Sequence, residues 1–353
     1  KVPSSAAVNE SVKLAKKVAP GTDRFVNAVL RNVDRQREDI GVDTLATSEE
    51  ERISYIYNQP LWLVRLWMDQ RGIEETMDLC EWFNETPLLT ARVNTLRISR
   101  QDLLEELSQA NWVVEPSHMI PDAIIIKAHK GQLQEAKWVQ EGLMTFMDEA
   151  SMAVAYAVQP QQHMQILDTC AAPGGKTLHM ATLMNNTGTI VATDIHEHKV
   201  KLLNELKNKY GYGNFQVRLN DATQIENLEV KFDKILLDMP CSGLGVLRKK
   251  PEKIYELTSN DIKNLKKLQK RIFESAYKCL KNGGEIVYST CTFSKNENTN
   301  NIRYFLKKYE DLEILDLEVP ESVEIVKDEF GGAYISYENK YMDGFYIAKL
   351  RKN

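Results

Sequence analysis

Short apolar runs alternate with stretches of helical apolar spacing through the second half of the chain. Five runs rich in Ile, Val and Leu predict strands, and the stretches between them predict helices. The predicted strands cover residues 166–169, 189–194, 215–219, 234–238 and 285–289. This alternation indicates a parallel sheet with helices on both faces, in which ligands bind beyond the carboxyl ends of the strands. A run at 344–350 predicts a last strand in an antiparallel hairpin.

The first 65 residues show only the helical pattern. Phe25, Val29 and Val33 belong to an apolar stripe, and short helices with such a stripe must pack on another part of the protein. In the next predicted helix, Trp62 and Trp67 are expected in a core and not as platforms for base stacking.

A third pattern covers residues 88 to 148. Strands are predicted at 89–94, 112–115, 123–127 and 143–147, and helices at 100–109 and 133–138. The order βαββαβ is that of ferredoxin-like and RNA-recognition (RRM-like) folds, although no strand carries the aromatic residues that stack on bases. We therefore expect a helical segment at 1–65, a ferredoxin-like or RRM-like α+β domain at 66–150 and an α/β domain at 151–353.

Composition narrows the class of protein. The net charge of −5 argues against a uniformly basic surface for nucleic acid. No apolar run is long enough to span a bilayer and no basic-then-apolar leader is present, so no membrane role is expected. The five cysteines form no CxxC pair, which argues against a disulfide framework and a structural zinc site and fits a reducing cytoplasm.

A glycine-rich turn follows the first strand of the α/β domain. The turn spans Asp168-Thr169-Cys170-Ala171-Ala172-Pro173-Gly174-Gly175-Lys176-Thr177 and leads into a predicted helix. Gly174 and Gly175 permit a tight turn that leaves N–H groups at the helix N-terminus open to a polar or charged ligand. Any α/β protein can contain such a glycine pair, so the turn alone does not identify a ligand.

Three acids follow at the same edge of the predicted sheet. Asp194 ends the second strand, where dinucleotide-binding folds place a carboxylate on ribose hydroxyls, and Asp221 and Asp238 follow or end the next two strands. Single acids at strand ends are often helix caps, but three at one edge favour a binding site. NAD is disfavoured because the turn is not GxGxxG and no positive charge follows Asp194 to meet a phosphate.

Two cysteines complete this edge. Cys241 and Cys291 follow the fourth and fifth strands, which should be neighbours, so both thiols are expected in one pocket as candidate nucleophiles. The other three cysteines, Cys80, Cys170 and Cys279, are expected to be small buried hydrophobic residues.

These residues resemble the motifs of a known family. The turn at 168–177, Leu-Asp-Met-Pro-Cys-Ser-Gly at 237–243, and Tyr-Ser-Thr-Cys-Thr at 288–292 followed by Glu297 and Asn298 resemble the RNA 5-methylcytosine methyltransferases of the NOL1/NOP2/Sun type. Residues 1–10 and 25–31 are similar to the end of the NusB-like helical domain of the RsmB/Sun branch. Because the chain starts at Lys1 inside a helical pattern, we expect most of that domain to be missing.

The resemblance implies a Rossmann-like class I methyltransferase core that uses S-adenosylmethionine. It assigns Cys291 as the nucleophile and Cys241 as the residue that assists release, roles that the residues alone do not separate. Asp238 would face the cytosine and border the cofactor, and Lys176 would lie near the base or the cofactor carboxylate. The backbone of Cys170, Ala171, Ala172, Pro173, Gly174, Gly175 and Lys176 would cradle the methionine moiety. Asp194 would take the ribose hydroxyls and Asp221 the adenine amine.

The implied substrate is a cytosine of 16S ribosomal RNA, either naked or in an early small-subunit particle, with a monomeric enzyme and no obligate protein partner. Residues 248–281 carry a net charge of +7, and their first five residues should border the RNA entrance, although a lysine-rich helix is often only solvated. An RNA-binding or assembly factor with a vestigial methyltransferase core is the alternative. The basic residues of this segment are Arg248, Lys249, Lys250, Lys253, Lys263, Lys266, Lys267, Lys270, Arg271, Lys278 and Lys281.

Overall fold

Helices form the first of the two units into which the chain divides, Lys1–Cys80 and Glu81–Asn353. The structure is a computed structural model that describes residues 2–36, 41, 45–335, 337 and 341–353. The helices are α1 (Ser4–Val18), α2 (Asp23–Arg35), α3 (Glu49–Tyr57), α4 (Leu61–Arg71) and α5 (Ile73–Phe83). The helical prediction for this region is confirmed, and the finer division of the chain at residues 65 and 150 stays a prediction.

The apolar residues of this first unit differ in burial. Trp67 is fully buried and Trp62 is partly buried, as their core position in α4 predicts. Phe25, Val29 and Val33 of α2 are all exposed. Within the described part of the first unit, these three side chains are therefore not covered.

An antiparallel sheet with two helical segments on it opens the second unit. Its elements are β1 (Leu89–Val93), α6 (Arg100–Gln109), β2 (Val113–Pro116), β3 (Ala123–Ala128), η2 (Leu133–Glu135), α7 (Lys137–Gln140) and β4 (Met144–Phe146). The strand order β2-β3-β1-β4 confirms the ferredoxin-like prediction. Ser99 caps α6 by accepting a hydrogen bond from the N–H of Asp102. Leu103 and Leu107 of this helix pack against the sheet.

A nine-stranded mixed sheet follows, in the order β11-β12-β13-β9-β8-β5-β6-β7 with β10 beside β13. The strands β5 (Gln165–Asp168), β6 (Thr189–Asp194), β7 (Phe215–Leu219), β8 (Phe232–Asp238) and β9 (Leu280–Thr290) are parallel, as predicted. β13 (Phe345–Lys352) lies between β9 and β12 and is antiparallel to both, which confirms the predicted last strand. The sequence reading missed the short strands β10 (Leu312–Leu315), β11 (Ile325–Lys327) and β12 (Ala333–Ile335).

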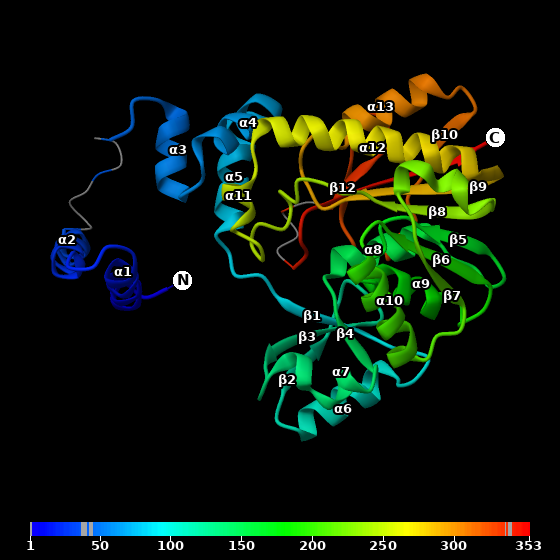
Figure 1. The fold of residues 1–353 in the computed structure, drawn as a ribbon, viewed down its shortest axis with the longest axis horizontal. Helices are drawn as coiled ribbons and strands as arrows, with labels where there is room; N and C mark the ends of the chain where they lie inside the picture. The colour runs from blue at the N-terminus through cyan, green and yellow to red at the C-terminus, as the bar shows by residue number, and fades with distance from the viewer. Residues whose placement is uncertain (1, 37–40, 42–44, 336, 338–340) are drawn as a thin grey trace. The chain divides into compact units, whose positions relative to one another are not determined.

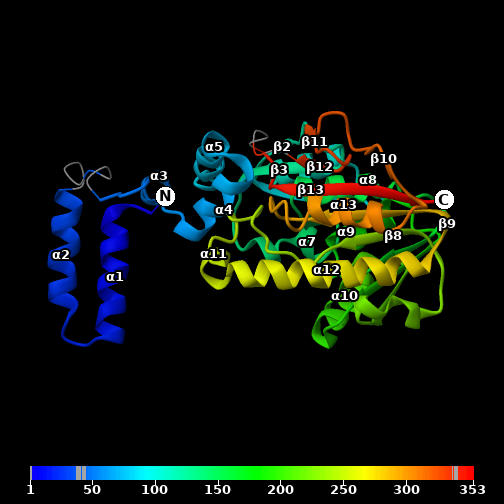
Figure 2. The same ribbon diagram turned by 90° about the horizontal axis from the view of Figure 1, so that it is seen from above.

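Helices cover both faces of this sheet. The right-handed crossovers from β5 to β6 and from β6 to β7 run in the direction opposite to those that lead to β8 and β9, so their helices lie on opposite faces. Figure 1 shows α9 (Gly175–Leu183) and α10 (Glu197–Tyr210) on one side and α12 (Ser259–Cys279) on the other. Figure 2 shows α12 extending along the length of the sheet. The remaining helices are α8 (Glu149–Val158), η3 (Ala222–Leu228), α11 (Lys253–Glu256) and α13 (Thr299–Lys308).

Buried polar contacts join the ferredoxin-like domain to helices α8 and α9 of the larger sheet's domain. Asp122 accepts a hydrogen bond from Tyr156 of α8 at 2.9 Å and lies 3.0 Å from Nε2 of His179 in α9. Arg92 of β1 donates to the hydroxyl of Thr182 in α9 at 3.0 Å, and both side chains are buried. Only two residues separate β4 from α8, so the two sheets are also closely tied by the chain itself.

Candidate active site

The turn between β5 and α9 is the first component of the site. Gly174 has a φ of +104°, which a residue with a side chain rarely adopts, and a Cβ there would lie 2.9 Å from Leu203 of α10. Asp168 ends β5 and accepts a hydrogen bond from the Thr177 hydroxyl at 2.7 Å. Its carboxyl group is buried, and this burial raises the pKa of Asp168 to about 7. Backbone conformation and packing therefore both define this turn.

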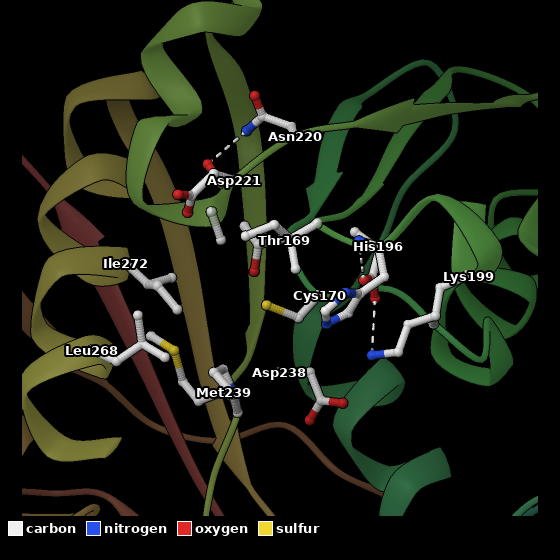
Figure 3. A pocket seen from close by; sticks show the side chains of 15 residues that line it. Thr169, Cys170, His196, Lys199, Asn220, Asp221, Asp238, Met239, Leu268 and Ile272 are labelled. Atoms are coloured by element: carbon white, nitrogen blue, oxygen red, sulfur yellow. Dashed lines mark hydrogen bonds and ion pairs between the residues drawn. The ribbon is translucent and has the colours of Figure 1, made fainter. Parts of the chain in front are cut away.

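A cavity of about 370 Å³ lies beyond the carboxyl ends of the parallel strands. Figure 3 shows the side chains of Cys170, Asp221 and Asp238 around it. The structure thus brings together five of the predicted cofactor residues, since Ala172 and Asp194 also line this cavity. The full lining is Thr169, Cys170, Ala172, Asp194, Ile195, His196, Lys199, Asn220, Asp221, Ala222, Asp238, Met239, Pro240, Leu268 and Ile272.

The charges in this cavity are mostly negative. Asp194 accepts the backbone N–H of His196 at 3.1 Å, and its other oxygen lies 3.6 Å from Nζ of Lys199. Asp221 caps η3 by accepting the N–H and the hydroxyl of Thr223, both at 2.8 Å. The sequence interpretation, in which no positive charge follows Asp194 to meet a phosphate, missed Lys199. This ammonium group is partly neutralised by Asp194, so it adds no strong phosphate site.

Residues 171–173, 175 and 176 of the turn line a second cavity of about 190 Å³. Lys176 and Asp238 form its polar side, with Lys176 Nζ 2.8 Å from Asp238 Oδ2, and Ser289 donates to Asp238 Oδ1 at 2.9 Å. Burial alone would lower the pKa of Lys176, but the adjacent Asp238 outweighs it and the pKa is raised. Asp238 also lines the larger cavity and so borders both. The lining is Phe146, Met147, Asp148, Ser151, Asp168, Ala171, Ala172, Pro173, Gly175, Lys176 and Asp238.

Two thiols lie just beyond the pair Asp238–Ser289, which are register partners in β8 and β9. The sulfur atoms of Cys241 and Cys291 are 3.3 Å apart, and both residues are partly buried. The hydrogen bond between them raises the pKa of Cys241 and lowers that of Cys291. The ammonium groups of Lys176 and Lys253 lower the pKa of Cys291 further. Cys291 is therefore the better candidate for a thiolate.

The other three cysteines lack these properties. Cys80 and Cys279 are buried, as predicted, and burial raises the pKa of Cys80 to about 12 and also raises that of Cys279. Cys170 is partly buried and lines the larger cavity, and burial likewise raises its pKa to about 12. None of the three is favoured as a nucleophile.

Comparisons with known proteins agree with the fold and the edge of the sheet at which these groups meet. Residues 155–351 match the family described as 16S rRNA methyltransferase RsmB/F, residues 59–131 match the RsmF/B-like ferredoxin-like domain, and residues 1–35 match the NusB family. The chain is 36% identical over 361 residues to the probable ribosomal RNA small subunit methyltransferase B of Bacillus subtilis, which covers 100% of this chain and 79% of that protein. The chain belongs to the RsmB/F family of 16S rRNA methyltransferases.

Two further relatives support the assignment of this RsmB/F-family chain. The probable ribosomal RNA small subunit methyltransferase B of Synechocystis is 34% identical over 99% of this chain and 79% of its own length. The crystal structure of a methyltransferase homolog protein from Pyrococcus horikoshii has a TM-score of 0.75 and 28% identity, and it covers 87% of this chain and 100% of its own. The predicted class I methyltransferase core, with ferredoxin-like and NusB-like parts before it, is thereby confirmed.

The basic segment of the RsmB/F-family chain differs from its prediction at its first residue. Arg248 is buried, stacks over the ring of Trp82 at 4.0 Å and lies 3.3 Å from Asp343, so it does not border an RNA entrance. Lys249 also pairs with Asp343, at 2.9 Å, and with Asp148. Both cations hold the loop before β13, because both pair with Asp343 in that loop. The guanidinium of Arg248 is stabilised away from water by this carboxylate and by the ring of Trp82.

Two further properties concern membrane spans and metal sites. Among the residues that the structure describes, none of the helices combines the length and the apolar character needed to cross a lipid bilayer. In that same part of the chain, His, Cys, Asp and Glu side chains form no group of three or more that could hold a metal ion.

Proposed function

We propose that this protein methylates C5 of a cytosine in 16S ribosomal RNA and forms a covalent bond between Cys291 and C6 of the base. The observation that carries the proposal is the thiol pair, in which Cys291 has the lowered pKa and lies 3.3 Å from Cys241. Carbon C5 of cytosine is too weak a nucleophile to accept a methyl group directly. A thiolate that adds to C6 moves electrons toward C5 and removes this obstacle.

The charges and the apolar side chains that line the larger cavity suit S-adenosylmethionine. The ligand carries a sulfonium and an ammonium group, and the cavity presents Asp194, Asp221 and Asp238 against the one ammonium group of Lys199. Apolar side chains from α12, Leu268 and Ile272, supply a wall for an adenine ring. A dinucleotide with its phosphates would instead meet repulsion from the three carboxylates.

Each acid then has a proposed role. Asp194 would hold the ribose hydroxyls and Asp221 the adenine amine, and the backbone of residues 170–176 would hold the methionine moiety. When bound, S-adenosylmethionine supplies the methyl group that C5 receives.

Residues at the second cavity would handle the base. Lys176 and Asp238 form a charge-paired polar wall there, which suits the N3 and amine edge of a cytosine. The base must leave its helix or loop stack to enter, at a cost of on the order of a few kcal/mol. The RNA is proposed to be naked or in an early particle, and the protein to act as a monomer without a protein partner.

The two cysteines divide the covalent work. The Cys291 thiolate forms the sulfur–C6 bond, and C5 is then methylated. The proton that C5 still carries passes to water, the C5–C6 double bond is restored, and the sulfur–C6 bond breaks. Cys241 keeps its proton because its pKa is raised, and its thiol donates a hydrogen bond to the Cys291 sulfur as that sulfur departs.

The direct test is transfer of labelled methyl groups to small-subunit ribosomal RNA, followed by bisulfite sequencing of the product. We expect label at a cytosine that resists bisulfite conversion, since 5-methylcytosine does so. Free RNA and isolated early particles are compared side by side. Label on another base, or on an exocyclic nitrogen or a ribose, would contradict the proposed chemistry.

Binding of S-adenosylmethionine tests the larger cavity by itself. We expect Asp194→Ala to weaken binding about 10- to 100-fold, the usual loss for hydrogen bonds to a charged group. Isothermal titration calorimetry measures this, with NAD titrated as the competing candidate. Glu197→Ala is the matched control, because Glu197 is an exposed acid that opens α10 and does not line the cavity. Equal affinities in both variants would remove Asp194 from the site.

A further inference from the structure

A buried carboxylate connects the two cysteine loops. Glu297 is fully buried, and its Oε1 accepts the backbone N–H of Ser242 at 2.9 Å while its Oε2 accepts the Ser242 hydroxyl at 2.6 Å. Gln269 of α12 donates a third hydrogen bond to Oε1 at 3.1 Å. Ser242 directly follows Cys241, so this carboxylate holds the loop that carries one of the two thiols.

The same network reaches the other thiol. The hydroxyl of Ser242 is 2.8 Å from the hydroxyl of Thr292, which directly follows Cys291. Asn298, next to Glu297, donates to the backbone oxygen of Thr292 at 2.8 Å. Glu297 therefore sits at one end of a chain of hydrogen bonds that joins the residue after Cys241 to the residue after Cys291.

A charge in this position needs a reason. A buried carboxylate is costly unless its hydrogen bonds compensate, and burial indeed raises the pKa of Glu297. The donors to this carboxylate from Ser242 and Gln269 are all neutral groups. Such a group serves geometry: it lies 55 residues from Ser242 in sequence, and it joins the loop of Ser242 and helix α12 to its own loop.

We propose that Glu297 is a positioning residue that keeps the thiols of Cys241 and Cys291 within hydrogen-bond distance. The carboxylate touches neither sulfur and acts through Ser242 and Thr292. When it is removed, the N–H and hydroxyl of Ser242 lose their acceptor, and the Cys241 loop can move away from Cys291. The consequence for chemistry, loss of the proton-donating partner of Cys291, rests on the proposed function.

Thiol chemistry without RNA or cofactor tests this proposal. Phenylarsine oxide binds two neighbouring thiols through two arsenic–sulfur bonds and releases one water, so its affinity reports the separation of the sulfur atoms. We expect Glu297→Ala to weaken its binding at least about tenfold, because the second thiol no longer adds its effective concentration. Cys241→Ala defines the level expected for a single thiol.

The pH dependence of Cys291 alkylation by iodoacetamide is the second measurement, with peptide mapping to separate it from the other cysteines. Since the hydrogen bond from Cys241 lowers the pKa of Cys291, Glu297→Ala should move the midpoint to higher pH, as Cys241→Ala should. In the double variant the two changes should not add, because they remove the same contact. A merely structural role for Glu297 would give additive effects.

Two milder variants protect the test against a failure to fold. Glu297→Gln keeps the shape and an acceptor for the Ser242 N–H, so it should stay near wild type, and Ser242→Ala should fall between wild type and Glu297→Ala. Wild-type arsenical affinity and midpoint pH in Glu297→Ala, or in Ser242→Ala if the former does not fold, would overturn the proposal. If the thiols behave as expected but no RNA is methylated, the proposed function fails and the positioning role stands.

Discussion

Cys291→Ala is expected to reduce methyl transfer to ribosomal RNA to assay background, a loss of at least about 10³-fold, because removal of a covalent nucleophile costs this much or more. Cys241→Ala should behave differently. It retains the sulfur that we propose attacks C6 but removes the thiol 3.3 Å away that we propose assists departure. We therefore expect a covalent protein–RNA species to accumulate in this variant.

Denaturing gel electrophoresis with labelled RNA distinguishes the two variants, since only a covalent species survives denaturation. Cys279→Ala is the matched control, because this thiol is buried in α12 and should leave both rate and gel unchanged. Accumulation in Cys291→Ala and not in Cys241→Ala would reverse the roles. Near-normal transfer by Cys291→Ala would contradict covalent catalysis by this residue.

Gly245→Ala is expected to be strongly destabilising. A Cβ at this position would lie 2.0 Å from the backbone oxygen of Gly344 and 3.0 Å from that of Cys291. Gly245 donates to the oxygen of Cys291 and accepts from the N–H of Gly344, both at 2.9 Å, so three backbone segments cross here. Backbone atoms cannot move aside as side chains do, and the crossing must open.

We expect a loss of about 3 kcal/mol or more in the free energy of unfolding, which corresponds to roughly 4–5 °C or more in melting temperature for a chain of this size. Differential scanning calorimetry measures this change. Gly213→Ala is the control, since a Cβ at Gly213 meets no atom within 4 Å and its φ is not positive. Gly245→Ala should also weaken the binding of phenylarsine oxide to the thiol pair, because the displaced oxygen belongs to Cys291. A melting temperature within 2 °C of wild type would show that the crossing relaxes easily.

Strand positions were predictable because their physical cause is local. Residues 189–194 and 215–219 match β6 and β7 from end to end, since the first contains an apolar run and the second alternates apolar and polar residues. The strands β10 to β12 were missed because each has only three or four residues, too few to show a period, and β10 and β11 are also only partly buried.

The site was predictable where residues follow directly from strand ends. Asp194, Asp238 and the two cysteines met at one edge because parallel strands must deliver their carboxyl ends together. Leu268 and Ile272 were missed as cavity wall, since the amphipathic pattern of α12 shows that a face is apolar without showing what it covers.

Long-range polar partners explain the remaining differences. Arg248 was expected at the surface, as arginine usually is, but its carboxylate partner lies 95 residues later in the chain. Glu297 belongs to the motif that follows the fifth parallel strand, but the spacing of that motif does not reveal its hydrogen bonds with Ser242. Such contacts depend on how the loops fold over one another, which no local pattern encodes.

The buried contacts of Asp122 and Arg92 with α8 and α9 have a consequence for how substrate is admitted. They hold β4, and with it Phe146 and Met147, against the turn that forms the other wall of the smaller cavity. A hinge between the ferredoxin-like sheet and the core would have to break these buried contacts and stretch a connection of two residues. The smaller cavity, which we propose as the site for the base, is accordingly preorganised, and we expect the nucleic acid to deform to enter it.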